Sequence, residues 1–267
     1  MSSFRRGLAA NSIKQIPIIF EDPEVKRLCV ENWGGHYIEG EITEYEASKV
    51  TTLNSVFYAN TDITKFNEFR YFTGVTSLYK SGSGDSVFGQ FTNCSNLVEI
   101  TIPSSVSDFR GAFRFSGIVD LDISTTTATT FRIESMVQGA SSGTTALRTV
   151  KLPGASCTGI ARGFRRARGL TTIEIDGTLD VSNISAFTSV FEACVSLANI
   201  VGTITGIKYN IAFSNSPLTR DSALVILDGL DSSSSNHNVI FKASTYNLLT
   251  DDDIAIATNK GWSVEQA

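Results

Sequence analysis

The sequence contains few of the groups from which catalytic and metal sites are usually built. It has only 2 histidines, His36 and His237, and its 4 cysteines form neither a Cys-x-x-Cys motif nor a close pair. A disulfide framework is therefore not expected. Charged residues make up only 18% of the chain, and no apolar run is long enough to cross a bilayer. We expect no metal, no cofactor and no membrane insertion.

The overall charge is acidic, which excludes one class of partner. The formal net charge at pH 7 is −5. Proteins that bind nucleic acid in general carry an excess of basic residues. We therefore expect no nucleic-acid partner.

Phenylalanine is the predominant aromatic residue of the chain. It has 17 Phe against 7 Tyr and 2 Trp. Because a phenyl ring has no polar group that needs water, this bias indicates buried positions at which rings stack.

A motif that begins with phenylalanine recurs along the middle of the chain. Its clearest copy contains Phe91, Cys94, Leu97, Ile100 and Ile102. Other copies begin at Phe57, Phe113, Met136, Phe164, Phe191 and Phe213. The first part of the motif suits a helical or 3₁₀ turn, and the second part alternates apolar with polar residues, which favours a short strand. A return about every 25 residues indicates stacked units. We expect an α+β repeat fold, a leucine-rich-repeat-like solenoid with short parallel strands.

Helix signals flank this region. Asp22 and Pro23 predict the start of a helix that ends at Gly34, and Thr43 and Glu46 have the spacing of a capping box. Near the C-terminus the pattern predicts helices over 219–229 and 250–259 and strands over 238–242 and 262–264.

These signals divide the chain into four parts. Residues 1–20 form an N-terminal anchoring arm, and residues 21–50 form a helical N-terminal cap. Residues 51–217 form the solenoid, and residues 218–267 form a small αβ C-terminal cap. Caps are expected because stacked units need sealed ends.

The motif Phe-x-x-Cys-x-x-Leu-x-x-Ile-x-Ile-Pro resembles that of the BspA-type leucine-rich-repeat proteins of gut Bacteroidetes and their phages, virion proteins of crAss-like phages among them. The resemblance extends over about residues 20–267 and is strongest at 20–33, at the Phe91 motif and at 218–227. It implies a repeat solenoid used for adhesion or recognition, without catalytic activity.

The N-terminus bears on where such a protein acts. Secreted adhesins of this family begin with a signal peptide, whereas here Arg5 and Arg6 precede no apolar run. Phage virion proteins need no such signal. We expect a non-enzymatic structural and binding protein of a bacteriophage virion (a fibre, decoration or tail-associated protein) that recognises a host surface or a glycan. A bacterial cell-surface adhesin with the same fold is the alternative.

Relatives often carry a segment similar to an EF-hand calcium loop after Trp33. With Gly40 at the sixth position of that loop, the first and third ligand positions hold Gly35 and Tyr37. Of the ligand set only Glu39, Thr43 and Glu46 remain. Calcium needs several clustered oxygen donors, so we expect a degenerate, metal-free loop.

Gly84, Asp85 and Ser86 resemble the Gly-Asp-Ser block of a lipase-type hydrolase. A serine nucleophile needs a histidine base, and the Asp-x-x-His block of that family is missing. A hydrolase is the least favoured alternative, and we interpret the segment as a loop.

Arginines gather in a stretch that has no acidic residue. Residues 151–170 contain Arg162, Arg165, Arg166 and Arg168, and Arg114 follows its motif phenylalanine as Arg165 follows Phe164. In one interpretation these five side chains are simply solvated. In the other they bind an acidic glycan, a lipid headgroup or an acidic partner surface, with Arg110, Arg132 and Arg148 extending the stripe.

The arm supplies the remaining candidate contacts. Residues 16–20 are short, apolar and β-favouring, so they could add an edge strand to a neighbour. The candidate anchor residues are Phe4, Arg5, Arg6, Ile16, Ile18 and Phe20. The expected partners through this arm are other virion proteins or copies of the same chain.

Overall fold

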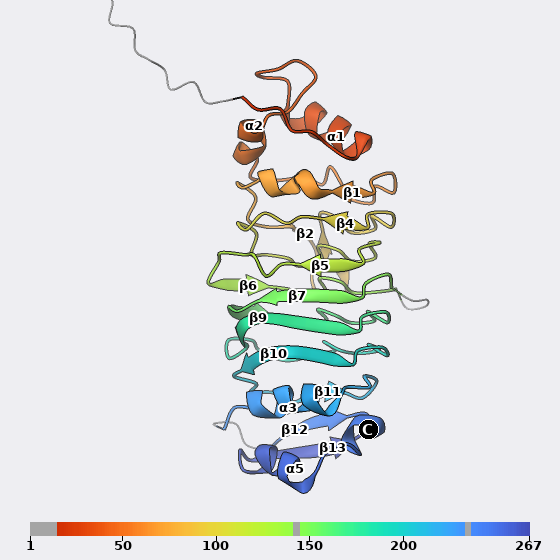
Figure 1. Cartoon of the computed structure of the whole chain (residues 1–267), viewed down its shortest axis with the longest axis vertical. Helices are drawn as coiled ribbons and strands as arrows, with labels where there is room; N and C mark the ends of the chain where they lie inside the picture. Colours follow the sequence, from red (N-terminus) through yellow and green to blue (C-terminus); the bar gives the residue numbers. More distant parts are fainter. Residues whose placement is uncertain (1–14, 141–144, 233–235) are drawn as a thin grey trace, which may run out of the picture.

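The computed structural model describes residues 15–140, 145–232 and 236–267 and shows one elongated molecule (Figure 1). The elements follow one another along its long axis in nearly the order of the sequence. One cluster of buried apolar side chains extends from Ile18 to Trp262, so these residues share a single core. Within the described ranges, no helix has both the length and the apolar character needed to pass through a bilayer.

The elements have the following bounds. The α-helices are α1 (Pro23–Trp33), α2 (Glu44–Lys49), α3 (Arg220–Gly229), α4 (Ala243–Tyr246) and α5 (Asp251–Thr258), and the 3₁₀ helices are η1 (Asn67–Tyr71) and η2 (Gly84–Ser86). The strands are β1 (Lys65–Phe66), β2 (Tyr79–Ser81), β3 (Phe88–Gly89), β4 (Glu99–Ile100), β5 (Asp120–Asp122), β6 (Thr130–Arg132), β7 (Thr149–Pro153), β8 (Ser156–Gly159), β9 (Thr172–Asp180), β10 (Asn199–Thr205), β11 (Ile211–Phe213), β12 (His237–Phe241) and β13 (Trp262–Gln266).

The expected leucine-rich-repeat solenoid is wrong. The chain forms mostly parallel strands in sheets that curl into a half-barrel, with few helices in the described ranges. The largest sheet has the order β5-β7-β9-β8-β6, and β10 also pairs with β9. Strands range from the 2 residues of β4 to the 9 residues of β9. Identical repeat units would give strands of equal length that all pair in the same way. The strands of this chain differ both in length and in pairing.

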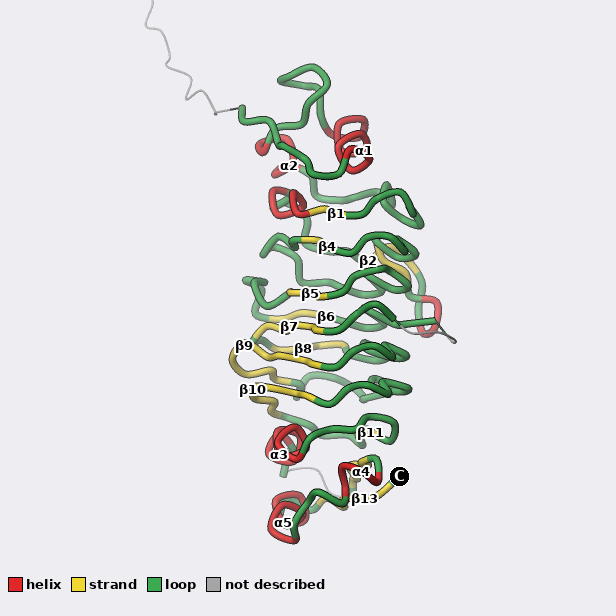
Figure 2. Tube along the Cα trace, turned by 45° about the vertical axis from the view of Figure 1, so that its right-hand side comes forward, coloured by secondary structure: helices red, strands yellow, loops and turns green. Residues whose placement is uncertain are grey.

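Two glycines account for the curl of the largest sheet (Figure 2). The first half of β9 pairs with β7, its last residue pairs with Ser156 of β8, and Gly177 lies between with φ +96°. On β10 the register shifts at Gly202, where φ is +120° and an added Cβ would lie 2.7 Å from that of Ile175. Only glycine adopts such conformations without strain, so both strands bend at the same level.

The motif does not form the helical turn that its first part suggests. In the copies that begin between Phe57 and Phe191, the residues from the first motif position to the small residue lie in turns, most of which include left-handed positions such as Asn93 (φ 62°), Phe115 (φ 57°) and Ala193 (φ 59°). The copy at Phe213 begins at the last residue of β11. A helix cannot pass through a left-handed residue.

The helices predicted from capping signals are confirmed. The Asp22 side chain caps α1, and Gly34 follows its last residue. Thr43 and Glu46 form a complete capping box at α2, as do Thr250 and Asp253 at α5. Thr219 caps α3. Side-chain oxygens here accept hydrogen bonds from the first helical N–H groups, which would otherwise have no partner.

The phenylalanine side chains stack in the core, as their number suggests. The rings of Phe91 and Phe113 are parallel within 4° at 5.6 Å, and those of Phe164 and Phe191 within 8° at 5.7 Å. Phe57 continues the first stack, whereas Phe213 and Phe241 continue the second. Met136 is buried between the two stacks.

The cysteines are small core residues. All four are free and buried. The thiols of Cys94 and Cys194 each contact a motif carbonyl, those of Phe57 and Phe164, at 3.0 Å. Burial raises the pKa of both thiols to about 12, so neither is a ready nucleophile at neutral pH.

Residues 15–20 use their backbone within the chain. Ile18 N–H donates to the Ile42 carbonyl at 2.9 Å, and Pro17 bridges to Thr43. Ile18 is only 3% exposed and belongs to the core, and Phe20 packs partly against it. Ile16 and Ile19 remain exposed, so they are the apolar side chains here that a neighbour could contact. Phe4, Arg5 and Arg6 lie outside the described residues.

Candidate functional site

Four of the five candidate arginines lie on one turn between β8 and β9. Phe164 and Ala167 fix this turn in the core, whereas Arg162, Arg165, Arg166 and Arg168 remain half-buried at its surface. Arg162 (φ 59°) and Arg166 (φ 60°) are left-handed. The next turn along the chain places the small residues Ser189 and Ala193 in this conformation. We call the four arginines of this turn the arginine patch.

A loop from far away in the sequence supplies a carboxylate to this patch. Asp85, on η2, places Oδ1 2.6 Å from Nε of Arg162 and 2.8 Å from Nη1 of Arg165. The Arg165 contact is a well-aligned hydrogen bond, whereas the Arg162 contact is an ion pair without hydrogen-bond alignment. Asp85 is 65% exposed at its side chain and Arg165 only 15%. Burial therefore holds the Arg165 side chain in place, whereas the Asp85 carboxylate contacts it from the solvent side.

Glu192 is the second carboxylate at the patch. Nε of Arg165 donates to its Oε2 at 3.0 Å, and Nη2 of Arg166 lies 3.9 Å from Oε1. Burial raises the pKa of Glu192, but hydrogen bonds from Ser189 and Arg165 outweigh this effect and hold it below the ordinary value. Three of the four guanidinium groups, those of Arg162, Arg165 and Arg166, thus lie within 4 Å of the carboxylates of Asp85 and Glu192.

Arg114, the fifth candidate, does not share the surface position of the other four. It is buried, donates from Nη1 to the Val87 carbonyl at 3.0 Å, and lies over the rings of Phe88 and Phe115. Burial lowers its pKa. A guanidinium in this position fixes the residues that follow η2 and offers little surface to a ligand.

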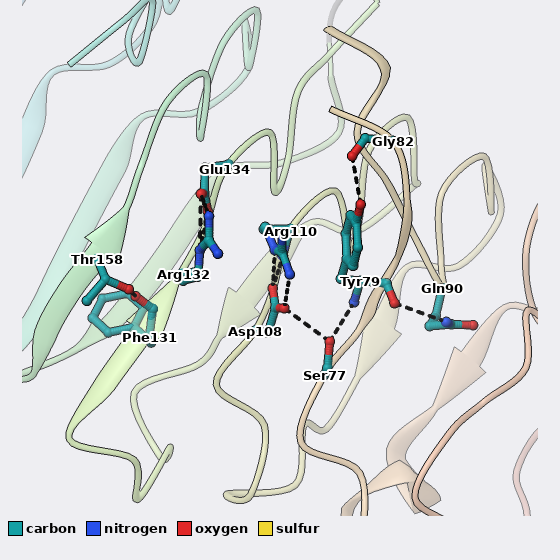
Figure 3. Close-up of polar contacts among 10 residues, drawn as sticks. All are labelled: Ser77, Tyr79, Gly82, Gln90, Asp108, Arg110, Phe131, Arg132, Glu134 and Thr158. Carbon is teal, nitrogen blue, oxygen red and sulfur yellow. Dashed lines mark hydrogen bonds and ion pairs between the residues drawn. The ribbon is translucent and has the colours of Figure 1, made fainter. Parts of the chain in front are cut away.

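Arg110, Arg132 and Arg148 do not extend the patch, because each is engaged locally; Figure 3 shows Arg110 and Arg132. Arg110 forms an ion pair with Asp108 at 2.6 Å and lies over the Tyr79 ring. Arg132 forms an ion pair with Glu134. Arg148 donates to the carbonyls of Thr145, Leu147 and Gly169.

The Gly-Asp-Ser segment takes part in charge pairing. Asp85 contacts arginines, while His36 and His237 lie on segments at opposite ends of the molecule (Figure 1). Within the described part of the chain, no group of three or more His, Cys, Asp or Glu residues could hold a metal ion. In the EF-hand-like loop, both oxygens of Glu46 accept hydrogen bonds, from the His36 N–H and from Thr43.

Sequence reasoning missed both carboxylates of the site. Asp85 is 80 positions from Arg165, and Glu192 is 27 positions from it. A stretch without acidic residues predicted an unpaired positive surface, but the fold brings acids from other turns. The chain gave one usable signal: Asp85 is the lone acidic residue in the glycine- and serine-rich segment 81–86.

Comparison with protein-family models, with curated proteins and with solved structures finds no match to this chain.

Proposed function

We propose that this chain is a non-enzymatic structural and binding protein that recognises an acidic glycan through the arginine patch. The observation that carries the proposal is the convergence of Arg162 and Arg165 on a single carboxylate oxygen of an exposed loop. The patch is thereby arranged to hold a carboxylate, and planar guanidinium groups suit carboxylates and sulfates alike.

Two features favour a glycan over a protein as the ligand. Protein interfaces have an apolar core, whereas Val195, on the turn of Glu192, is the one large apolar side chain in the described ranges that is exposed on the turns of the patch. The Asp85 carboxylate is also mostly exposed, and exposed ion pairs contribute at most about 1 kcal/mol. A ligand carboxylate can therefore replace it at small cost.

The binding test uses two variants that should change the affinity for an acidic oligosaccharide in opposite directions. We expect Arg165→Glu/Arg166→Glu to weaken binding of a sulfated or uronic-acid oligosaccharide at least tenfold, measured by calorimetry. Asp85→Asn should strengthen it several-fold, because it removes the internal competitor. Glutamate is no more strained than arginine at the left-handed position 166, so the fold should persist.

The control keeps the net charge of the double variant. Arg27→Glu/Arg70→Glu changes two exposed arginines away from the patch by the same amount. If this control weakens binding equally, attraction is non-specific, and the proposal fails. It also fails if the patch variant binds as wild type.

We further propose that the protein is a virion component, a proposal supported by the elongated shape of the molecule (Figure 1). Mass spectrometry of purified phage particles should detect it in fixed proportion to the major capsid protein. Surface labelling of intact bacteria is the matching measurement. Detection on uninfected cells and absence from particles would make the protein a bacterial adhesin instead.

A further inference from the structure

A hollow at the N-terminal end is lined by residues from the end of α1, the loop over 34–42 and α2. Figure 1 shows these three segments together at that end of the molecule. This hollow has a volume of about 440 Å³. Its lining includes Asn32, Trp33, His36, Tyr37, Tyr45 and Lys49. Small-molecule sites typically have volumes of roughly 300–1,000 Å³ and combine aromatic walls with a few polar groups.

The aromatic walls are held in place. Trp33 packs against Phe57 at 6.2 Å and edge-on against Phe72 at 5.7 Å, so the core fixes its indole. Tyr37 meets Tyr45 edge to face at 5.8 Å. Tyr37 is nevertheless 54% exposed, in a chain that buries most of its phenylalanines. An exposed tyrosine ring that a second ring holds in place offers a ligand a flat apolar face together with a phenol hydroxyl.

The charges in the hollow restrict what it can hold. Nζ of Lys49 lies 4.8 Å from the centre of the Tyr45 ring. The lining carboxylate, Glu46, already accepts hydrogen bonds from the His36 N–H and from Thr43. A cationic ligand would meet an ammonium group and find this carboxylate engaged. The hollow therefore favours a neutral or an acidic ligand.

We infer that this hollow binds a saccharide unit, independently of the arginine patch. A pyranose has an apolar C–H face, which can stack on Tyr37, and equatorial hydroxyls, which need hydrogen-bond partners. Asn32 donates its amide N–H to the Leu28 carbonyl, which leaves its Oδ1 as an acceptor for the sugar. His36 supplies a further polar group, and Lys49 would add affinity for a sugar that carries a carboxylate.

The test is an array of neutral and carboxylated oligosaccharides with the full chain, followed by titration of each retained sugar. Tyr37→Ala should weaken binding at least tenfold, while Tyr209→Ala, a partly exposed tyrosine beyond β10, should leave it unchanged. Lys49→Met should weaken only the carboxylated sugars. Tryptophan fluorescence should respond through Trp33, because Trp262 is buried in the C-terminal region and donates to the Asp231 carbonyl.

The outcomes separate the two sites. Retention of no saccharide, or equal binding by wild type and Tyr37→Ala, would overturn the inference. Binding lost in Arg165→Glu/Arg166→Glu but kept in Tyr37→Ala would also overturn it, and would leave the proposed function standing. The reverse result would support the hollow and count against the patch.

Discussion

Replacing Phe91 with alanine should lower the free energy of unfolding by about 4 kcal/mol. Its ring is fully buried and lies between Phe57 at 5.5 Å and Phe113 at 5.6 Å, with Phe69 edge-on at 5.7 Å. Neighbouring rings fixed by their own stacking cannot collapse into the space, so a cavity remains and its cost adds to the lost burial. Denaturant unfolding followed by circular dichroism measures the change.

A conservative variant at the same position and a variant at a nearby exposed position serve as comparisons. Phe91→Leu keeps most of the volume and should cost about 1.5 kcal/mol. Val98→Ala removes an exposed side chain nearby and should change stability by less than about 0.5 kcal/mol. A Phe91→Ala loss close to the Val98→Ala value would mean that the ring stack contributes little.

Replacing Asp22 with alanine should cost about 3 kcal/mol. Its Oδ1 accepts the N–H groups of Glu24 and Val25 and caps α1. Its Oδ2 accepts the N–H and hydroxyl of Thr64, at 2.7 and 2.8 Å, and the Lys65 N–H. Alanine removes the cap and also leaves the donors at the start of β1 without a partner, so the loss exceeds that of a cap alone.

Thr219 provides the matched comparison. It caps α3 by accepting from the Ser222 N–H, and its side chain reaches β10 only indirectly, through the Ser222 hydroxyl that accepts from the Ile200 N–H. Thr219→Ala should therefore cost about 1 kcal/mol. An equal loss in the two variants would refute the view that Asp22 fastens α1 to β1.

The effect of Asp22 should also depend on pH. Burial raises its pKa, but hydrogen bonds led by those from Thr64 outweigh this effect, so its pKa lies below the ordinary value. A depressed folded-state pKa gives stability that is fully present above the unfolded pKa of about 3.9 and is lost as pH falls through the folded value. The stability difference between wild type and Asp22→Asn should therefore shrink below about pH 4.

The sequence predicted helix ends better than sheet partners because the two depend on different distances along the chain. Asp22, Thr43 and Thr250 cap helices within three residues of themselves. The motif marks apolar strand residues, but it cannot say that β9 pairs with β7 along one half and reaches β8 at its end. The solenoid prediction failed at that point, since it assumed one partner pattern for every strand.

The candidate site was predictable to the same limited degree. The sequence shows the arginines as a cluster but does not show their burial or their counterions, and Arg114 is buried with its guanidinium over the rings of Phe88 and Phe115. Asp85 was placed in a loop by its glycine and serine neighbours, with no indication of its arginine contacts. The aromatic hollow could not be predicted because its lining comes from α1, the loop over 34–42 and α2, and the approach of Tyr37 to Tyr45 depends on how that loop folds.

Met136 has a mechanical consequence. It stands where the motif otherwise has phenylalanine, and it separates the rings from Phe57 to Phe113 from those of Phe164 to Phe241. Flat rings in contact resist sliding, whereas a thioether chain has more rotatable bonds and can change shape without losing contact. We therefore expect the stack of core side chains to yield most easily at Met136 when a load is applied to the two ends of the molecule, close to the turn that carries the arginines.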